Sequence, residues 1–270
     1  MRGASRASLA EATDRLSAVM AGSPAAGQLG DELFAVVSLL DSQQALRRAL
    51  ADSASARDAR SGLAAAVLGA RVSASAAELV SSVVTQTWSS PADLVDALEQ
   101  LAVLAVVTIA DRDGHLDDLE DDLFRFARIV GGQPELRAAL GNPFAPAQAK
   151  EQLVSTLLAG RATPEAVQLV TRASLHPRGR SLDGNLEDCA ALAARYRERL
   201  VAEVRVATEL SAVQRRRLAA ALAAAYGHQV HLNMVLDPQV IGGMIIRVGG
   251  EQIDASVASR LAELRRRLAA

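Results

Sequence analysis

The chain of 270 residues is poor in several residue types, and each scarcity excludes a class of protein. A single cysteine, Cys189, cannot form an intrachain disulfide framework or a cysteine-based zinc site, and it favours a reducing compartment. The most apolar stretch is 101–110, whereas about 20 residues are needed to span a bilayer. The first ten residues contain no apolar run of signal-peptide length. We therefore expect a soluble protein that does not span a membrane, although it can sit on a membrane assembly.

Aromatic residues and lysine are also scarce. Aromatic residues make up 3% of the chain, although hydrophobic residues make up 50%, and Ala, Leu and Val supply most of these. Lys150 is the single lysine among 29 basic residues, and the net charge is only −2. An ordinary apolar fraction with a low net charge excludes general disorder. This composition predicts helices that pack closely on small side chains.

The usual motifs of catalysis and cofactor binding are missing. The sequence contains no G-x-S-x-G, no G-x-x-x-x-G-K-[ST] and no G-x-G-x-x-G. Its four histidines have no metal-binding spacing. The pair Gly242-Gly243 lies inside an expected strand, where it favours a bulge or a close approach of backbones. We therefore expect no cofactor, no metal and no enzymatic activity.

An acidic segment over 111–120 partly matches a calcium-binding EF-hand loop. Asp111, Asp113, Gly114 and Glu120 fit positions 3, 5, 6 and 12 of such a loop. Ile109 then falls at position 1, where an aliphatic side chain cannot bind calcium. We expect an acidic helix-turn-helix whose carboxylates favour the N-terminus of the next helix.

From Ser5 to about residue 200, apolar residues recur at helical spacing. The pattern predicts a first helix that carries Leu9, Leu16 and Met20, and a second that carries the stripe from Leu29 to Leu40. Further helices are predicted over 43–51, 57–70, 74–88 and 91–110, the last with Pro91 at its first turn.

A comparison of the sequence with itself reveals an internal repeat. Residues 29–80 align with 119–170 without a gap, and sixteen aligned pairs are identical, including Phe34 with Phe124 and Arg47 with Arg137. Several identities are leucines, which any two Leu-rich helices can share, but the absence of gaps favours duplication. Helix 91–110 then closes the first bundle and opens the second, and at 1.5 Å per residue its length is about 30 Å.

After residue 200 the apolar period changes from 3.6 to 2, which indicates strands. Alternating runs over 202–206, 230–236 and 240–248 precede Gly249-Gly250, a pair suited to a hairpin turn, and the strand 251–253 returns. Helices are expected over 211–226 and at the C-terminus. The predicted fold class is mainly α with a small α+β C-terminal domain: two tandem helical bundles, 1–92 and 93–198, and a sheet with two helices over 199–270.

Two features of the C-terminal part have alternative interpretations. The final helix carries a coiled-coil-like seam formed by four residues, Val257, Leu261, Leu264 and Leu268. This seam either packs on its own sheet or binds an amphipathic helix of a partner. Two arginine triplets, 215–217 and 265–267, raise the alternative of a helical regulator that binds nucleic acid. The stretch has one aromatic residue for stacking, so solvated helix faces explain the triplets better.

The C-terminal run from Asp237 to Leu261 resembles the signature of the F-type ATP synthase delta subunit family, known in mitochondria as the oligomycin-sensitivity-conferring protein. The family pattern falls on eight residues, Ile241, Gly242, Gly243, Gly249, Ile253, Asp254, Ser256 and Arg260. Gly250 replaces the usual Asp, and the N-terminal helix keeps only part of the family pattern. The chain is about 90 residues longer than is usual, which the repeat explains, so it resembles the longer actinobacterial type with a duplicated helical domain.

The resemblance implies a non-catalytic stator subunit in the peripheral stalk, at the cytoplasmic face of the plasma membrane. Its partners would be the N-terminal helices of alpha subunits and the C-terminal helix of the b subunit, with no nucleic acid. By analogy with the family's groove between helices 1 and 5, the first bundle would bind through Leu9, Leu16, Leu79 and Val83. The matching residues of the second bundle are Val106, Leu169 and Ala173.

Overall fold

The structure is a computed structural model that describes residues 3–22, 26–199, 201–226, 230–238, 240, 242–248 and 251–254. Its helices are α1 (Ala4–Gly22), α2 (Ala26–Ser42), α3 (Gln44–Ala51), α4 (Arg57–Leu68), the 3-10 turn Gly69–Arg71, α5 (Ala74–Thr85), α6 (Pro91–Arg112), α7 (Leu116–Gly132), α8 (Pro134–Gly141), α9 (Ala147–Leu158), α10 (Pro164–Leu175), α11 (Leu182–Arg199) and α12 (Ala212–Tyr226). Its strands are β1 (Val201–Val206), β2 (His231–Leu236), β3 (Met244–Val248) and β4 (Glu251–Asp254). The predicted fold class, mainly α with a small α+β C-terminal part, is confirmed.

The described helices divide between two compact units, Met1–Ala193 and Ala194–Ala270. The first unit holds the predicted bundle 1–92 and most of the predicted bundle 93–198, which therefore pack together, and the boundary between the units falls within α11. The structure agrees with the duplication, because the bounds of α2, α3, α4 and α5 each reappear 90 residues later as the bounds of α7, α8, α9 and α10. Residues 94–112 of α6, nearly the whole helix, likewise lie 90 residues after α1.

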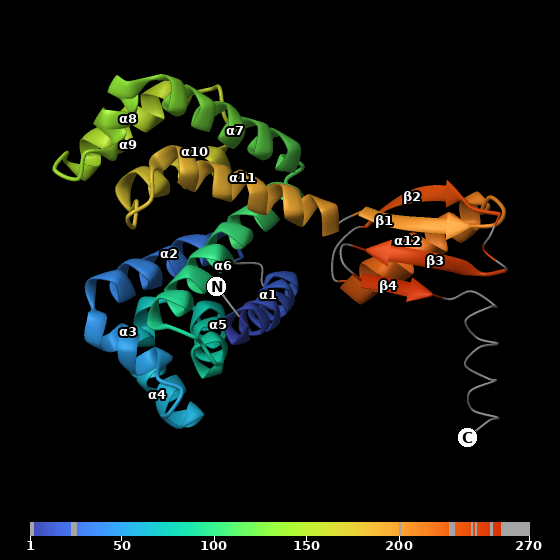
Figure 1. Ribbon diagram of the computed structural model, residues 1–270, viewed down its shortest axis with the longest axis horizontal. Coiled ribbons are helices and arrows are strands. Elements are labelled where there is room, and N and C mark those ends of the chain that lie inside the picture. Colours follow the sequence, from blue (N-terminus) through green and yellow to red (C-terminus); the bar gives the residue numbers. More distant parts are fainter. Residues whose placement is uncertain are drawn as a thin grey trace. The chain divides into compact units, whose positions relative to one another are not determined.

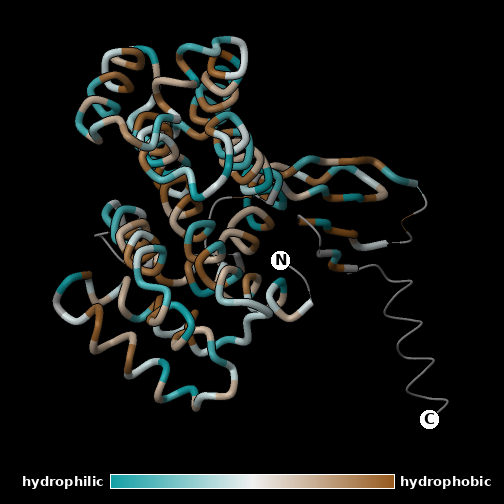
Figure 2. The backbone as a smooth tube through the Cα atoms, turned by 60° about the vertical axis from the view of Figure 1, so that its left-hand side comes forward, coloured by the Kyte–Doolittle hydropathy of each residue, from teal (hydrophilic) through white to brown (hydrophobic). Residues whose placement is uncertain are grey.

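Helix α6 belongs to both bundles, as the sequence predicts. It contacts α1, α2, α3 and α5 of the first copy and α7 and α10 of the second, and Figure 1 shows it passing from the first group of helices to the second. Eleven of its residues are buried: Leu94, Val95, Ala97, Leu98, Leu101, Ala102, Val103, Ala105, Val106, Val107 and Ala110. A helix that is apolar around its whole circumference has to be central. Figure 2 shows the other helices with hydrophobic and hydrophilic residues in alternation, as amphipathic helices require.

Equivalent polar contacts fix the ends of equivalent helices in the two copies. Ser73 caps α5 and its backbone N–H donates to Glu32 Oε1 at 2.7 Å. Thr163 caps α10 in the same way, and its N–H donates to Asp122 Oδ2 at 2.8 Å. Such caps satisfy backbone donors that have no partner inside the helix. The two copies thus share their local polar construction as well as their apolar pattern.

The second unit is built on a mixed four-stranded sheet with the strand order β2-β1-β3-β4. Strands β1 and β2 are parallel and are connected through α12, whereas β1 with β3 and β3 with β4 are antiparallel. The pairing of Val248 with Glu251 closes the predicted hairpin. A small core lies between the sheet and α12, formed by Ala202, Val204, Val206, Leu222, Val230, Ile246 and Val248.

One predicted strand begins later than the alternation indicates. The strand was expected over 240–248, but β3 begins at Met244. Gly242 and Gly243 have φ angles of 67° and 79°, in the left-handed region that interrupts an extended chain. The pair therefore forms a bend before the strand and not a bulge within it. The predicted final helix lies outside the described residues.

Candidate helix-binding surfaces

The residues predicted to line a groove in the first bundle lie mostly beneath its surface. Helices α1 and α5 pack against each other. Leu16 on α1 is 2% exposed, and Leu79 and Val83 on α5 are fully buried, whereas Leu9 on α1 is half-buried. Three of the four side chains therefore belong to the core under the α1–α5 surface, and Leu9 is the one that keeps contact with solvent.

Two buried serines, which the sequence analysis missed, hold α1 in this position. Ser5 Oγ donates to Asp93 Oδ2 at 2.7 Å and accepts from the backbone N–H of Ser89 at 2.8 Å. Ser8 Oγ donates to the carbonyl oxygen of Thr87 at 2.8 Å. These bonds tie the first turns of α1 to the connection between α5 and α6, so the α1–α5 surface is fixed at this end.

An ion pair crosses the outer side of α1 and α5. Arg15 on α1 contacts Glu78 on α5, and their side chains are 46% and 57% exposed. Pairs this exposed contribute little to stability. Their exposure shows instead that solvent reaches this side of the two helices.

The corresponding surface of the second bundle, between α6 and α10, is covered by the first bundle. The predicted residues Val106, Leu169 and Ala173 are 3%, 1% and 8% exposed. Helix α2 crosses α6 at Gly30, where an added Cβ would lie only 2.8 Å from Val106 Cγ2 and 3.4 Å from the carbonyl oxygen of Ala102. Glycine permits this close approach because it has no side chain.

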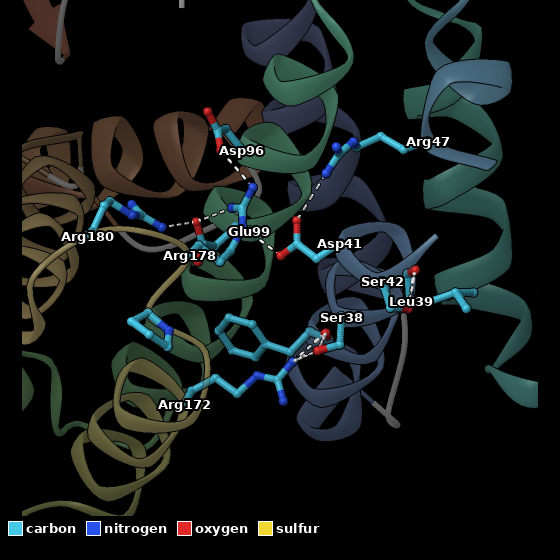
Figure 3. A network of polar contacts seen from close by, with 12 residues as sticks. Ser38, Leu39, Asp41, Ser42, Arg47, Asp96, Glu99, Arg172, Arg178 and Arg180 are labelled. Atoms are coloured by element: carbon cyan, nitrogen blue, oxygen red, sulfur yellow. Dashed lines mark hydrogen bonds and ion pairs between the residues drawn. The ribbon is translucent and has the colours of Figure 1, made fainter. Parts of the chain in front are cut away.

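Polar side chains of α10 fasten α2 in place. Gln168 Nε2 donates to Asp31 Oδ1 at 2.6 Å. Arg172 donates to the carbonyl oxygen of Phe34, and to Ser38 Oγ at 2.7 Å, and Figure 3 shows its side chain reaching toward Ser38. Its guanidinium carbon lies 4.9 Å from the centroid of the Phe34 ring. Burial lowers the pKa of Arg172, and the negative charges of Asp31 and Glu99 oppose this shift only in part. The guanidinium still stays charged at neutral pH.

A second cationic anchor lies in the connection between α10 and α11. Arg178 pairs with Asp41 on α2 at 2.7 Å, and with Asp96 at 3.0 Å and Glu99 at 2.7 Å on α6 (Figure 3). Its side chain is 13% exposed. Burial lowers the pKa of Arg178, but Glu99, Asp41 and Asp96 outweigh it and raise the pKa above its ordinary value. One guanidinium thus joins a carboxylate of α2, in the first copy, to two carboxylates of the shared helix α6.

The two copies also bury a cation at equivalent positions. Arg60 on α4 donates to the carbonyl oxygens of Val84 at 2.7 Å and Gln86 at 2.8 Å. Lys150, 90 residues later on α9, donates to the carbonyl oxygen of Ser174 at 3.0 Å. Both cations satisfy carbonyls at a helix C-terminus, where positive charge is favourable. The single lysine of the chain therefore has a structural role.

No second-unit residue proposed for partner binding can be placed, because Val257, Leu261, Leu264 and Leu268 lie outside the described residues. The first arginine triplet, 215–217, is exposed on α12, as a solvated helix face would be. The second triplet also lies outside the described residues.

The acidic turn between α6 and α7 has an ordinary structural explanation. Gly114 takes a left-handed φ of 77° between the two helices, and Asp117 and Asp118 fall in the first turn of α7, where acidic side chains are favourable. Over the part of the chain that the structure describes, no three His, Cys, Asp or Glu residues gather as a metal site. Within the same residues, no helix is both long and apolar enough to cross a bilayer.

Known proteins resemble this chain over most or all of its length. A family model described as ATP synthase delta (OSCP) subunit matches residues 103–268, from within α6 to the C-terminal unit. Curated proteins named ATP synthase subunit delta match over the whole length. The one from Streptomyces avermitilis is 50% identical over 99% of this chain and 98% of its own. Those from Streptomyces coelicolor, at 48%, and Thermobifida fusca, at 47%, each match 100% of this chain, and 98% and 100% of their own.

Proposed function

Because the chain belongs to the ATP synthase delta (OSCP) subunit family, whose members are non-catalytic stator components of the F-type ATP synthase, we propose that it joins alpha subunits of the catalytic head to the b subunit of the peripheral stalk. The joint would lie at the cytoplasmic face of the plasma membrane, as a peripheral protein. A stator transmits force, so it needs parts that do not shift under load. The locked pair of bundles provides such a part.

The observation that carries this proposal is the joining of the two bundles into one body. They share α6, and Arg172 and Arg178 bind the second copy to a carbonyl oxygen and a carboxylate of α2 in the first. Charged hydrogen bonds that are largely withdrawn from water are stronger and more directional than exposed ones. A bending force on one bundle is therefore passed to the other without a flexible linker between them.

The alpha-binding end is assigned to the helical unit and the b-binding end to the C-terminal part. In the helical unit, Leu9 is the predicted groove residue that solvent still reaches. Leu16, Leu79 and Val83 would support the groove from below. In the C-terminal part, the seam of Val257, Leu261, Leu264 and Leu268 would contact the b subunit.

Isothermal titration calorimetry with two ligands tests both ends. The full chain is titrated with a synthetic N-terminal peptide of the alpha subunit and, separately, with a C-terminal fragment of the b subunit from the same genome. Binding of each at micromolar concentration is expected, whereas scrambled peptides should give no heat. Absence of binding to both at tens of micromolar would refute the proposed function.

Variants separate the alpha-binding surface from the rest of the molecule. Leu9→Gln should weaken binding of the alpha peptide several-fold and leave binding of the b fragment unchanged. Leu63→Gln is the matched control, because Leu63 is also a half-buried leucine but lies on α4. Equal loss of alpha binding in the two variants would show that Leu9 has no special role.

A further inference from the structure

The two copies of the helical domain present the same kind of surface in two different states. We call the surface between α1 and α5 the first seam, and the surface between α6 and α10 the second seam. The repeat relates them, because α10 lies 90 residues after α5 and residues 94–112 of α6 lie 90 residues after α1. A difference between the seams therefore shows what the duplication has changed.

The second seam already holds a helix, which is α2 of the first copy. Gly30 of α2 meets Val106 of α6, while Asp31 and Phe34 of α2 meet Gln168 and Arg172 of α10. A hollow of about 340 Å³ remains between the three helices, lined by Gly27, Gly30, Asp31, Ala105, Val106, Ile109, Pro164, Glu165 and Gln168. Helix α2 thus covers the second seam by packing on α6, and its polar side chains reach across to α10.

Helix α2 cannot leave this place without breaking the first bundle. Its opposite side supplies Leu29, Leu33, Val36 and Leu40 to the core, each at most 2% exposed. Burial of four such side chains is strongly favourable, so together they hold α2 firmly in the core. Displacement by a partner helix would cost this energy and the contacts of Gln168 and Arg172 as well.

The first seam differs at the positions that hold α2 in the second. The counterparts of Ala105 and Gln168 are Arg15 and Glu78, which pair with each other and are exposed. The counterpart of Arg172 is Ser82, which has no guanidinium to offer. The first seam is therefore not built to bind another α2, and a second copy of this chain would not be its partner. Its exposed charges suit an amphipathic helix with an acid placed toward Arg15 and a base toward Glu78.

We propose that the chain fills its second seam with its own α2 and keeps one vacant seam, between α1 and α5, for a single helix of the alpha subunit. This inference rests on the proposed function for the identity of the helix. The region that supplies α2 also lies outside the residues matched by the family model, 103–268. The additional copy thus closes one docking surface and supplies another.

A cross-link that locks α2 onto α10 tests the filled seam directly. The variant Asp31→Cys with Gln168→Cys, in a Cys189→Ser background, is treated with a short bis-maleimide, because the two side chains meet at 2.6 Å in the wild-type chain. The locked chain should bind the alpha N-terminal peptide with unchanged affinity and a stoichiometry of one. Loss of binding on locking, or two peptides bound by the unlocked chain, would overturn the proposal.

Charge reversal tests the vacant seam. Glu78→Arg places two like charges on the first seam and should weaken binding of the alpha peptide at least tenfold. Glu151→Arg is the matched control, because Glu151 is exposed on α9, away from both seams. In hydrogen exchange, the bound peptide should protect amides of α1 and α5 and leave those of α10 unchanged. Protection of α10 alone would overturn the assignment.

The proposed function can fail separately. If the unlocked chain binds no alpha peptide while the cross-link forms, the vacant seam and the alpha-binding end of the proposed function are both wrong, and the filled seam stands. If the peptide binds but protects helices outside the first seam, the proposed function stands and the assignment of the vacant seam is wrong.

Discussion

The crossing of α2 and α6 at Gly30 allows a quantitative prediction, because an added methyl group would have opposite effects at two glycines of the chain. Gly30→Ala gains helix propensity, about 1 kcal/mol. Its Cβ, however, would lie 2.8 Å from Val106 Cγ2 and 3.4 Å from the carbonyl oxygen of Ala102. Overpacking of this kind costs typically about 1–3 kcal/mol. Since backbone closes one side of the space, we take the upper half of that range and expect a net loss of about 1–2 kcal/mol.

Gly62 on α4 is the matched control. It is also a helical glycine, but no heavy atom lies within 4 Å of an added Cβ. Gly62→Ala should therefore stabilise the chain by about 0.5–1 kcal/mol. Unfolding in urea can be followed through the fluorescence of Trp88, which is 5% exposed and donates its indole N–H to the carbonyl oxygen of Val83 at 2.9 Å. This probe reports on the helical unit and not on the sheet.

A second substitution identifies the cause of the effect. Val106→Ala removes the methyl group that the new Cβ would meet, so the double variant with Gly30→Ala should lose less stability than the two single effects added together. If Gly30→Ala stabilises the chain as much as Gly62→Ala does, the close approach of α2 and α6 is wrong, and the filled second seam with it.

Three further predictions concern buried polar groups. Arg178→Gln should destabilise the helical unit by about 2 kcal/mol, measured by unfolding in urea. The loss is smaller than for a fully buried pair because Asp96 is 47% exposed. A loss no larger than that of Arg125→Gln, where the arginine of the pair is 65% exposed, would contradict the anchor. Lys150→Met should lower the free energy of unfolding by about 1–3 kcal/mol, because it leaves the carbonyl oxygen of Ser174 without its hydrogen bond. Lys150→Arg should restore stability, because Arg60 fills the equivalent place in the first copy. Burial, and after it the negative charge of Glu99, raises the pKa of Cys189 to about 12. Its thiol should therefore react with a disulfide reagent at pH 8 far more slowly in the folded chain than in urea. Equal rates in the two conditions would contradict this.

Periodicity and the repeat predict most of the helical architecture from the sequence. The expected helix over 91–110 is α6, and its role in both bundles follows from its position between two aligned segments. The strands of the C-terminal unit and the hairpin between β3 and β4 were also predictable, except where the left-handed glycines 242 and 243 delay β3. These features depend on residues near one another in the sequence.

The contacts between the copies could not be predicted in this way. Phe34 and Phe124 are identical in the alignment, yet Phe34 is 4% exposed under Arg172 and Phe124 is 54% exposed. Their burial is decided by which helix of the other copy covers them, and the alignment contains no information on that. Lys150 was conspicuous as the single lysine, but its role became clear only from its distance to Ser174.

Because α6 belongs to both bundles, the sequence contains no boundary at which the duplicated domain could be divided cleanly. A division at residue 92 would remove α6 from the first bundle, and in the second bundle it would expose the apolar side of α6 that the first bundle had covered. Removal of one full period is different, because α1 is the counterpart of residues 94–112 of α6. Deletion of residues 26–115 would join α1 to α7 in the original frame, giving a chain of 180 residues with one complete bundle. A helix that serves two domains thus makes a whole repeat the smallest piece that the gene could gain or lose.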